Sequence, residues 1–253
     1  MFVTGEAAVQ TKTIRYKLGD QEFIGHLAWD DAVSGKRPGV LVVHEWWGLN
    51  DFARGRANEL AKLGYVAFAC DMFGGGKLAQ RPDEAGQLIK QLTENFPEWQ
   101  KRANASLEVL RQQPSCDASR LAAIGYCFGG STTLVLACSG ADLGAVVTFH
   151  ASVQAPTADQ ARAIKASIVV CHGALDSFTS DETMLKFRKV LDDAHVDYEI
   201  DYYGGAKHGF AVPDADKRGM PSLGYNQKAD KRSWNRMLAC FEEKFGKVTV
   251  GAA

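Results

Sequence analysis

The sequence motif with the most specific chemistry is GYCFGG at residues 125–130, which follows the short apolar run Leu121–Ile124 and precedes a helical stretch. A cysteine flanked by glycines at a strand-to-helix turn matches the nucleophile elbow of hydrolases, with cysteine in place of serine. The turn forces its central residue into strained backbone geometry, and the glycines leave room for it. The nearby helix N-terminus favours a thiolate. The motif predicts a nucleophile at Cys127, and the alternative is a buried cysteine in a glycine-rich packing turn.

A base and an acid follow this motif in the order that such an architecture requires. Asp176 comes soon after the apolar run Ile168–Cys171, and His208 comes after Tyr198–Tyr203 in a glycine-bearing turn. A neutral imidazole can take the proton of a thiol and return it to a leaving oxygen, while a carboxylate fixes the tautomer of the ring. The order predicts a Cys-His-Asp triad. The alternatives are a helix-capping role for Asp176, although Asp181 or Ser180 is better placed, and a surface position for His208.

The sequence HEWWGLN at residues 44–50 follows another apolar run and is expected to help stabilise an oxyanion. In this architecture the loop supplies one backbone N–H and the residue after the nucleophile supplies the other, here Trp46 and Phe128. Trp47 and Tyr126 are predicted to contact the substrate. For Trp47, a place in the hydrophobic core is an equally good interpretation.

Three histidines, His44, His150 and His172, also lie at the ends of expected strands, where ligands of open α/β sheets gather. They lack the spacing of known metal-binding motifs, and a thiol triad requires no metal. We therefore expect neither a metal nor a cofactor, and we expect these histidines to line the floor of the pocket.

The elements that must position these residues alternate between strands and helices. An N-terminal hairpin is predicted at Lys12–Leu18 and Glu22–Trp29, joined by Gly19-Asp20. Continuous apolar runs then predict buried parallel strands, at Val40–Val43, Tyr65–Cys70, Leu121–Ile124, Ala145–Phe149 and Ile168–Cys171. A last strand is predicted at Tyr198–Tyr203, before the loop that holds His208. Helical segments separate them, at Phe52–Leu63, Pro82–Gln113 with a break at Pro97, Gly130–Cys138, Glu182–Ala194 and Tyr225–Phe245. The pattern predicts an α/β-hydrolase fold, with a mostly parallel central sheet, an antiparallel hairpin and helices on both faces.

Composition narrows the possible partners and location. The 253 residues show no shift in composition or linker, so a single domain is predicted over residues 1–253. A net charge of −1 gives no basic excess for nucleic acid or anionic lipid. The N-terminus lacks the pattern of a signal peptide or a membrane span, and the six cysteines form no C-x-x-C pair. We expect a cytoplasmic monomer or homodimer without membrane or nucleic-acid partners.

The chain resembles the dienelactone hydrolase family, whose activity is that of a carboxymethylenebutenolidase, over nearly its whole length. The resemblance rests on HEWWGLN at 44–50, GYVA at 64–67 with DMFG at 71–74, IGYCFGG at 124–130, FH at 149–150, HG at 172–173 with Asp176, and GAKHGF at 205–210. It implies the triad Cys127, Asp176 and His208. It also implies a role for Glu45, which in the family holds the resting thiol neutral and releases it when substrate arrives.

One departure concerns the substrate. Family members grip a substrate carboxylate with two arginines, one of them four residues beyond the catalytic histidine, where this chain has Val212. The other arginine would come in the segment that contains Arg81, which is our candidate for substrate binding. At least half of a bidentate carboxylate clamp is therefore missing, and ester hydrolysis is better supported than activity on dienelactone itself.

We therefore expect a hydrolase that cleaves a small carboxylic ester or lactone through an acyl-cysteine. The alternatives are a thioesterase and a non-catalytic receptor that binds a small ligand on the same fold. Glutamine amidotransferases share the cysteine elbow but carry a glutamate two residues after their histidine, where this chain has Phe210.

Overall fold

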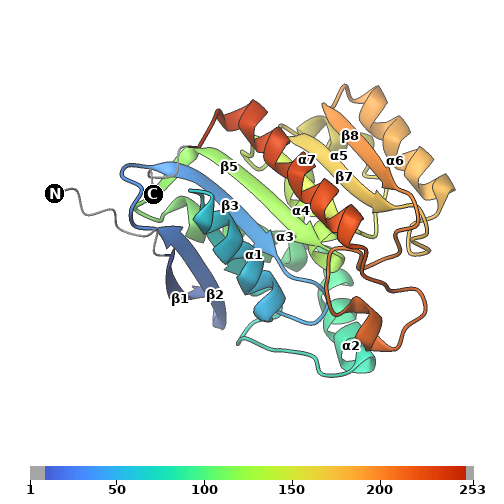
Figure 1. The fold of residues 1–253 in the computed structure, drawn as a ribbon, viewed down its shortest axis with the longest axis horizontal. Helices are drawn as coiled ribbons and strands as arrows, with labels where there is room; N and C mark the ends of the chain where they lie inside the picture. The colour runs from blue at the N-terminus through green and yellow to red at the C-terminus, as the bar shows by residue number, and fades with distance from the viewer. Residues whose placement is uncertain (1–8, 249–253) are drawn as a thin grey trace. The chain divides into compact units, whose positions relative to one another are not determined.

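The computed structural model describes residues 9–248, which form eight strands and the helices between them in the order shown in Figure 1. The hydrogen-bonded order of the strands is β1-β2-β4-β3-β5-β6-β7-β8. By packing, the described residues divide into unit 1, residues 9–122 and 245–248, and unit 2, residues 123–244. The predicted α/β fold class is confirmed, whereas the single domain stays a prediction.

Unit 1 begins with the predicted hairpin, β1 (Val9–Leu18) and β2 (Gln21–Asp30), which pair in antiparallel fashion. Strand β2 pairs antiparallel with β4 (Val66–Cys70), and β4 pairs in parallel with β3 (Arg37–Val43). Both β3 and β4 are buried along their whole length, which explains their unbroken apolar sequences.

The described part of unit 1 has three helices, α1 (Asp51–Lys62), α2 (Pro82–Thr93) and α3 (Phe96–Arg111). Helix α1 lies in front of the strands of this unit in Figure 1, and α3 lies behind them. The expected break at Pro97 is a short turn before α3, where the side chain of Asn95 accepts the N–H of Glu98 and caps the helix. Proline fits the first turn of a helix, where its missing N–H costs nothing.

Strand β5 (Cys116–Tyr126) is shared, because its residues 116–122 belong to unit 1 and its last four belong to unit 2. Unit 2 continues with β6 (Ala145–Phe149), β7 (Ser167–Gly173) and β8 (Tyr198–Tyr203). Strand β7 pairs in parallel with both of its neighbours. Parallel pairing brings the carboxyl ends of these strands to one edge of unit 2, and the loops that leave this edge carry its candidate site residues.

The helices of unit 2 are α4 (Phe128–Cys138), α5 (Ala158–Ala163), α6 (Asp181–Asp193) and α7 (Gln227–Phe245), with a short 3₁₀ helix at Ala215–Arg218. Figure 1 shows α7 in front of the strands of this unit and α4 behind them. The side chain of Ser180 caps α6 by accepting the N–H of Thr183. Of the two residues expected to cap better than Asp176, Ser180 is therefore the cap and Asp181 is the first residue of the helix.

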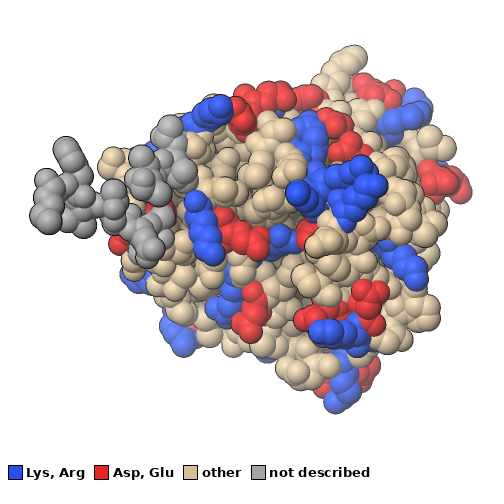
Figure 2. All heavy atoms as spheres, viewed as in Figure 1, with Lys and Arg blue, Asp and Glu red and all other residues tan. Residues whose placement is uncertain are grey.

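The distribution of charged side chains on the surface and the composition of the helices bear on the expected partners. On the face drawn in Figure 2, acidic and basic side chains are interspersed. No helix in residues 9–248 combines the length and the apolar composition that a membrane crossing requires.

Candidate active site

Cys127 occupies the sharp turn between β5 and α4, as the motif predicts. Its backbone has φ 54° and ψ −119°, a conformation that is strained for any residue with a side chain. Two backbone hydrogen bonds hold it there: its N–H donates to the carbonyl of Phe149 at 3.0 Å, and its carbonyl accepts the N–H of Gly130 at 3.0 Å. The surrounding structure thus holds the cysteine side chain at the start of α4.

The flanking glycines are required by close packing. A Cβ atom on Gly125 would lie 2.1 Å from the backbone oxygen of Gly129, and one on Gly130 would lie 2.6 Å from the Cβ of Ala151. Neither distance is possible without moving the backbone. The steric reason that the sequence suggested for these glycines is therefore confirmed.

Asp176 and His208 meet as predicted, on the loops that follow β7 and β8. His208 Nδ1 lies 2.8 Å from Asp176 Oδ2, and both residues are buried. The other oxygen, Oδ1, accepts the N–H of Phe178 at 2.9 Å. The carboxylate is thereby oriented by one bond within its own loop and by one bond to the histidine.

Gly173 allows the two loops to come this close. A Cβ atom at this position would lie 2.6 Å from the backbone oxygen of Ala206 and 2.9 Å from that of Lys207. The N–H of Leu175 also donates to the carbonyl of Ala206 at 2.8 Å. The separation between Asp176 and His208 therefore depends on backbone contact between their loops.

The side chain of His208 is hydrogen-bonded to Asp176 and is near enough to Cys127 for the thiol to act on its pKa. Burial alone would lower the pKa of His208, but the charge of Cys127, the hydrogen bonds to Asp176 and Cys127, and the charge of Asp176 together raise this pKa to about 10. The arrangement favours an imidazolium beside the sulfur. All three side chains belong to unit 2.

Two aromatic rings contact the imidazole of His208. The ring centroid of Phe178 lies 4.5 Å from that of His208, and the centroid of His150 lies 5.2 Å from it in an edge-to-face arrangement. His150 is fully buried and has φ 42°, and its N–H donates to the carbonyl of Cys171 at 2.9 Å. The sequence placed His150 at this edge of the sheet, but nothing in it singled out Phe178, which only its position two residues after the acid could have suggested.

His44 and His172, the other two histidines expected at strand ends, are also buried. His44, in unit 1, accepts the N–H of Met72 through Nε2 at 3.1 Å and bonds the carbonyl of Glu45 through Nδ1. The ring of His44 thus forms hydrogen bonds with backbone groups of two loops. Burial lowers the pKa of both His44 and His172, so both are neutral at physiological pH.

The remaining predicted residues occupy varied surroundings, and their roles stay predictions. In unit 1, Glu45 is buried and Trp46 is half-buried. Trp47 is buried in a small cluster with Ala79 and Ala85, as the core interpretation expects, and this leaves little of its surface for a ligand. Arg81 is exposed and forms ion pairs with two neighbours, at 3.2 Å to Asp83 and 2.9 Å to Glu84.

Two predicted residues in unit 2 flank Cys127. Tyr126 is fully buried and stacks on Phe149 with a centroid distance of 4.6 Å. Phe128 begins α4, so its N–H lies at the positive end of the helix dipole.

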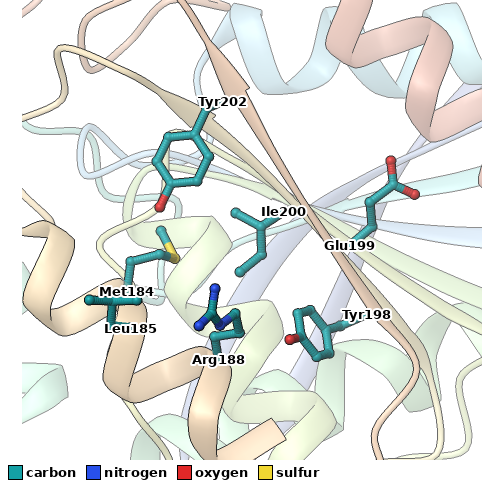
Figure 3. A pocket seen from close by; sticks show the side chains of 7 residues that line it. All are labelled: Met184, Leu185, Arg188, Tyr198, Glu199, Ile200 and Tyr202. Atoms are coloured by element: carbon teal, nitrogen blue, oxygen red, sulfur yellow. The ribbon is translucent and has the colours of Figure 1, made fainter. Parts of the chain in front are cut away.

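A separate groove of about 460 Å³ lies between α6 and β8, and Figure 3 shows the side chains that line it. It is formed by Met184, Leu185, Arg188, Tyr198, Glu199, Ile200 and Tyr202. None of these is a predicted site residue, so this groove is distinct from the cluster around Cys127.

Comparison with known proteins decides the family. The profile of the dienelactone hydrolase family matches residues 23–245. The chain belongs to this family. A dienelactone hydrolase-like promiscuous phosphotriesterase from metagenomic libraries is 41% identical, with a TM-score of 0.92 over 94% of this chain and all of the other.

Two further matches extend the comparison. Protein usf of Aquifex pyrophilus is 30% identical over 81% of this chain and 88% of its own length. Acylaminoacyl peptidase of Pyrococcus horikoshii is 18% identical, with a TM-score of 0.71 over 98% of this chain and 44% of the other, and this likeness concerns the fold alone. These findings confirm the predicted hydrolase fold and the predicted family. As a dienelactone hydrolase family member, the chain is a hydrolase.

Proposed function

We propose that this hydrolase cleaves a small carboxylic ester or lactone through an acyl-cysteine intermediate. The observation that carries the proposal is the position of His208, whose Nδ1 lies 2.8 Å from Asp176 Oδ2 and whose pKa is raised by the nearby Cys127, all within unit 2. A candidate base thus interacts both with a nucleophile and with the group that orients the base. The family assignment supports hydrolysis as the reaction.

The first half of the reaction forms the acyl-enzyme. The sulfur of Cys127 attacks the carbonyl carbon, and its proton resides on His208. When the tetrahedral intermediate collapses, the carbon–oxygen bond of the ester breaks, and His208 gives its proton to the leaving alkoxide. Asp176 keeps the imidazole in the required tautomer and offsets its charge.

The second half returns the enzyme to its starting state. His208 takes a proton from water, the resulting hydroxide attacks the thioester carbonyl, and the carbon–sulfur bond breaks to release the carboxylic acid and leave the sulfur of Cys127 with the proton on His208. The N–H of Phe128 is our candidate donor to the oxyanion in both halves. The second donor, Trp46, and the control of the thiol by Glu45 stay predictions.

The substrate differs from that of relatives with a complete carboxylate clamp. Val212 is buried and offers no charge, and Arg81 is paired with acidic neighbours. An ester or lactone without a carboxylate therefore fits this chain better than dienelactone. A phosphotriester is a second candidate, because the 41% identical relative is described as a promiscuous phosphotriesterase. A thioesterase and a ligand-binding receptor remain as alternatives.

The test compares turnover by the wild-type protein and by Cys127→Ala on p-nitrophenyl acetate, a set of lactones, an acyl thioester and a p-nitrophenyl phosphotriester. We expect ester or lactone turnover by the wild type, and in Cys127→Ala a loss of at least about 1000-fold. Mass spectrometry of the wild type, quenched during turnover of the acetate, should show one acetyl group on the peptide that contains Cys127.

The matched control is Cys138→Ala, which removes another half-buried thiol of unit 2 and should retain turnover and acetylation. Equal rates for the wild type and Cys127→Ala would contradict the proposal. A wild-type protein that binds lactones without hydrolysing any substrate of the panel would favour the receptor.

A further inference from the structure

Exposed apolar side chains gather beside the acid of the proposed triad. In the loop between β7 and α6, Leu175 is 59% exposed and Phe178 is 48% exposed, and Asp176 lies between them in the sequence. Exposed phenylalanine and leucine side chains carry a cost in water, so their position next to a reactive group points to an apolar ligand that covers them.

Phe178 is fixed relative to the reacting groups. Its N–H donates to Asp176 Oδ1 at 2.9 Å, and its ring lies 4.5 Å from the ring of His208 with an angle of 45° between the planes. Asp176 and His208 are both buried, so these contacts hold Phe178 in place. Phe178 itself is 48% exposed to solvent. The exposed part of the ring is therefore a preformed apolar surface beside the imidazole.

The chemistry of the reaction determines which part of a substrate meets this surface. The leaving oxygen of an ester must approach His208, because His208 supplies its proton, and the group attached to that oxygen then lies near the ring next to His208. We propose that Phe178 is a specificity-determining residue, which packs against the leaving group of the ester and favours flat aryl leaving groups over short alkyl ones. This inference rests on the proposed function and names its substrate class.

The kinetic test uses two substrates with the same acyl group, phenyl acetate and ethyl acetate. Replacing Phe178 with Ala should lower kcat/KM about 10-fold for phenyl acetate, mainly by raising KM, and less than about 3-fold for ethyl acetate. Phe178→Leu should recover part of the loss. The control Leu185→Ala removes a similarly exposed side chain from the groove of Figure 3 and should leave kcat/KM unchanged for both substrates.

A binding measurement separates this inference from the proposed function. Phenol, the alcohol released from phenyl acetate, is added to Cys127→Ala and to Cys127→Ala/Phe178→Ala, and its binding is followed by saturation-transfer NMR with ethanol as the reference. We expect the phenol signal to weaken at least about 5-fold when Phe178 is also removed.

The outcomes are distinct. If Phe178→Ala lost kcat/KM equally for phenyl and ethyl acetate and its pH profile were displaced, Phe178 would only support His208. If its kinetics were unchanged, Phe178 would have no role in specificity. Either result overturns the inference. If the wild type hydrolyses no ester, the proposed function fails, and the phenol measurement alone decides whether Phe178 forms an aryl-binding surface.

Discussion

His208 is a buried histidine whose surroundings favour a positive charge. Burial opposes this charge, but the sulfur of Cys127 and the carboxylate of Asp176 are close enough to outweigh the loss of solvation and to raise the pKa of His208 to about 10. A histidine in this state can donate a proton to a leaving group throughout the neutral range. The residue is thus suited to the acid step, and the adjacent sulfur to the attack.

The first prediction concerns the dependence of activity on pH. The protonated form of His208 acts as the acid, so kcat/KM should be maintained below its folded-state pKa and should fall as the pH rises through about 10. Asp176→Asn removes a charge and an acceptor that raise this pKa. We expect the alkaline fall to move to lower pH by about one unit or more, and kcat to drop at least about 100-fold because the amide no longer fixes the tautomer.

The control for this measurement is Asp181→Asn, which neutralises a carboxylate at the exposed start of α6. Asp181→Asn should leave unchanged the pH at which kcat/KM falls on the alkaline side. If Asp176→Asn kept the wild-type profile, or moved the fall to higher pH, Asp176 would not be the group that supports the charge of His208.

At the residue scale, the sequence predicts the proposed triad well, because its order along the chain and its positions after strands are local features. Cys127, Asp176 and His208 are brought together as expected. Phe178 could not be predicted in this way, since its contact with His208 depends on the path of a loop after Asp176. The burial of Tyr126 depends on stacking against Phe149 from a neighbouring strand, and no local pattern shows such a contact.

At the scale of elements, the site depends on how closely the loop after β7 approaches the loop after β8. Gly173→Ala would place a Cβ 2.6 Å from the backbone oxygen of Ala206, in the segment that carries His208. A backbone atom cannot move aside as the end of a flexible side chain can. We expect a loss of about 1–3 kcal/mol in the free energy of unfolding and a fall of at least about 10-fold in kcat, as His208 is displaced from Asp176.

Gly204→Ala is the matched control, because a Cβ at Gly204, in the same loop as His208, meets no atom within 4 Å. Urea denaturation and steady-state kinetics on both variants provide the measurement. A Gly173→Ala protein with wild-type kcat would show that the contact between the loops does not set the position of His208.

The elements themselves were predictable where their apolar pattern is continuous. The bounds of β6 agree with those predicted from its continuous apolar run. The bounds of β8 agree as well, although its sequence contains Glu199 and Asp201, because Gly204 and Gly205 end the strand. Strand β5 begins earlier than predicted, at Cys116, because its first half is partly exposed and polar and lacks an apolar run. Helix α5 was not predicted. It has six residues, too few for a periodic pattern, and is marked by the capping box of Thr157 and Gln160.

At the scale of the whole molecule, the division into two units runs through the middle of one strand. Ala122 and Ala123 are neighbours in β5, yet they belong to different units. A domain boundary normally lies in an exposed linker, and a buried strand is an unusual place for one. This continuity supports the predicted single domain, since unfolding either unit would break the strand that the other also uses.

The last prediction follows from that continuity, and the chain contains its own probes. Cys70 on β4 and Cys171 on β7 are both fully buried, one in each unit, and burial raises the pKa of each thiol to about 12. Pulsed alkylation across a urea gradient, read by mass spectrometry of the two peptides, should give one common midpoint. Cys127, which is only partly buried, should react before unfolding and thus checks the reagent. Two separate midpoints would mean that the units unfold independently and that the chain holds two domains.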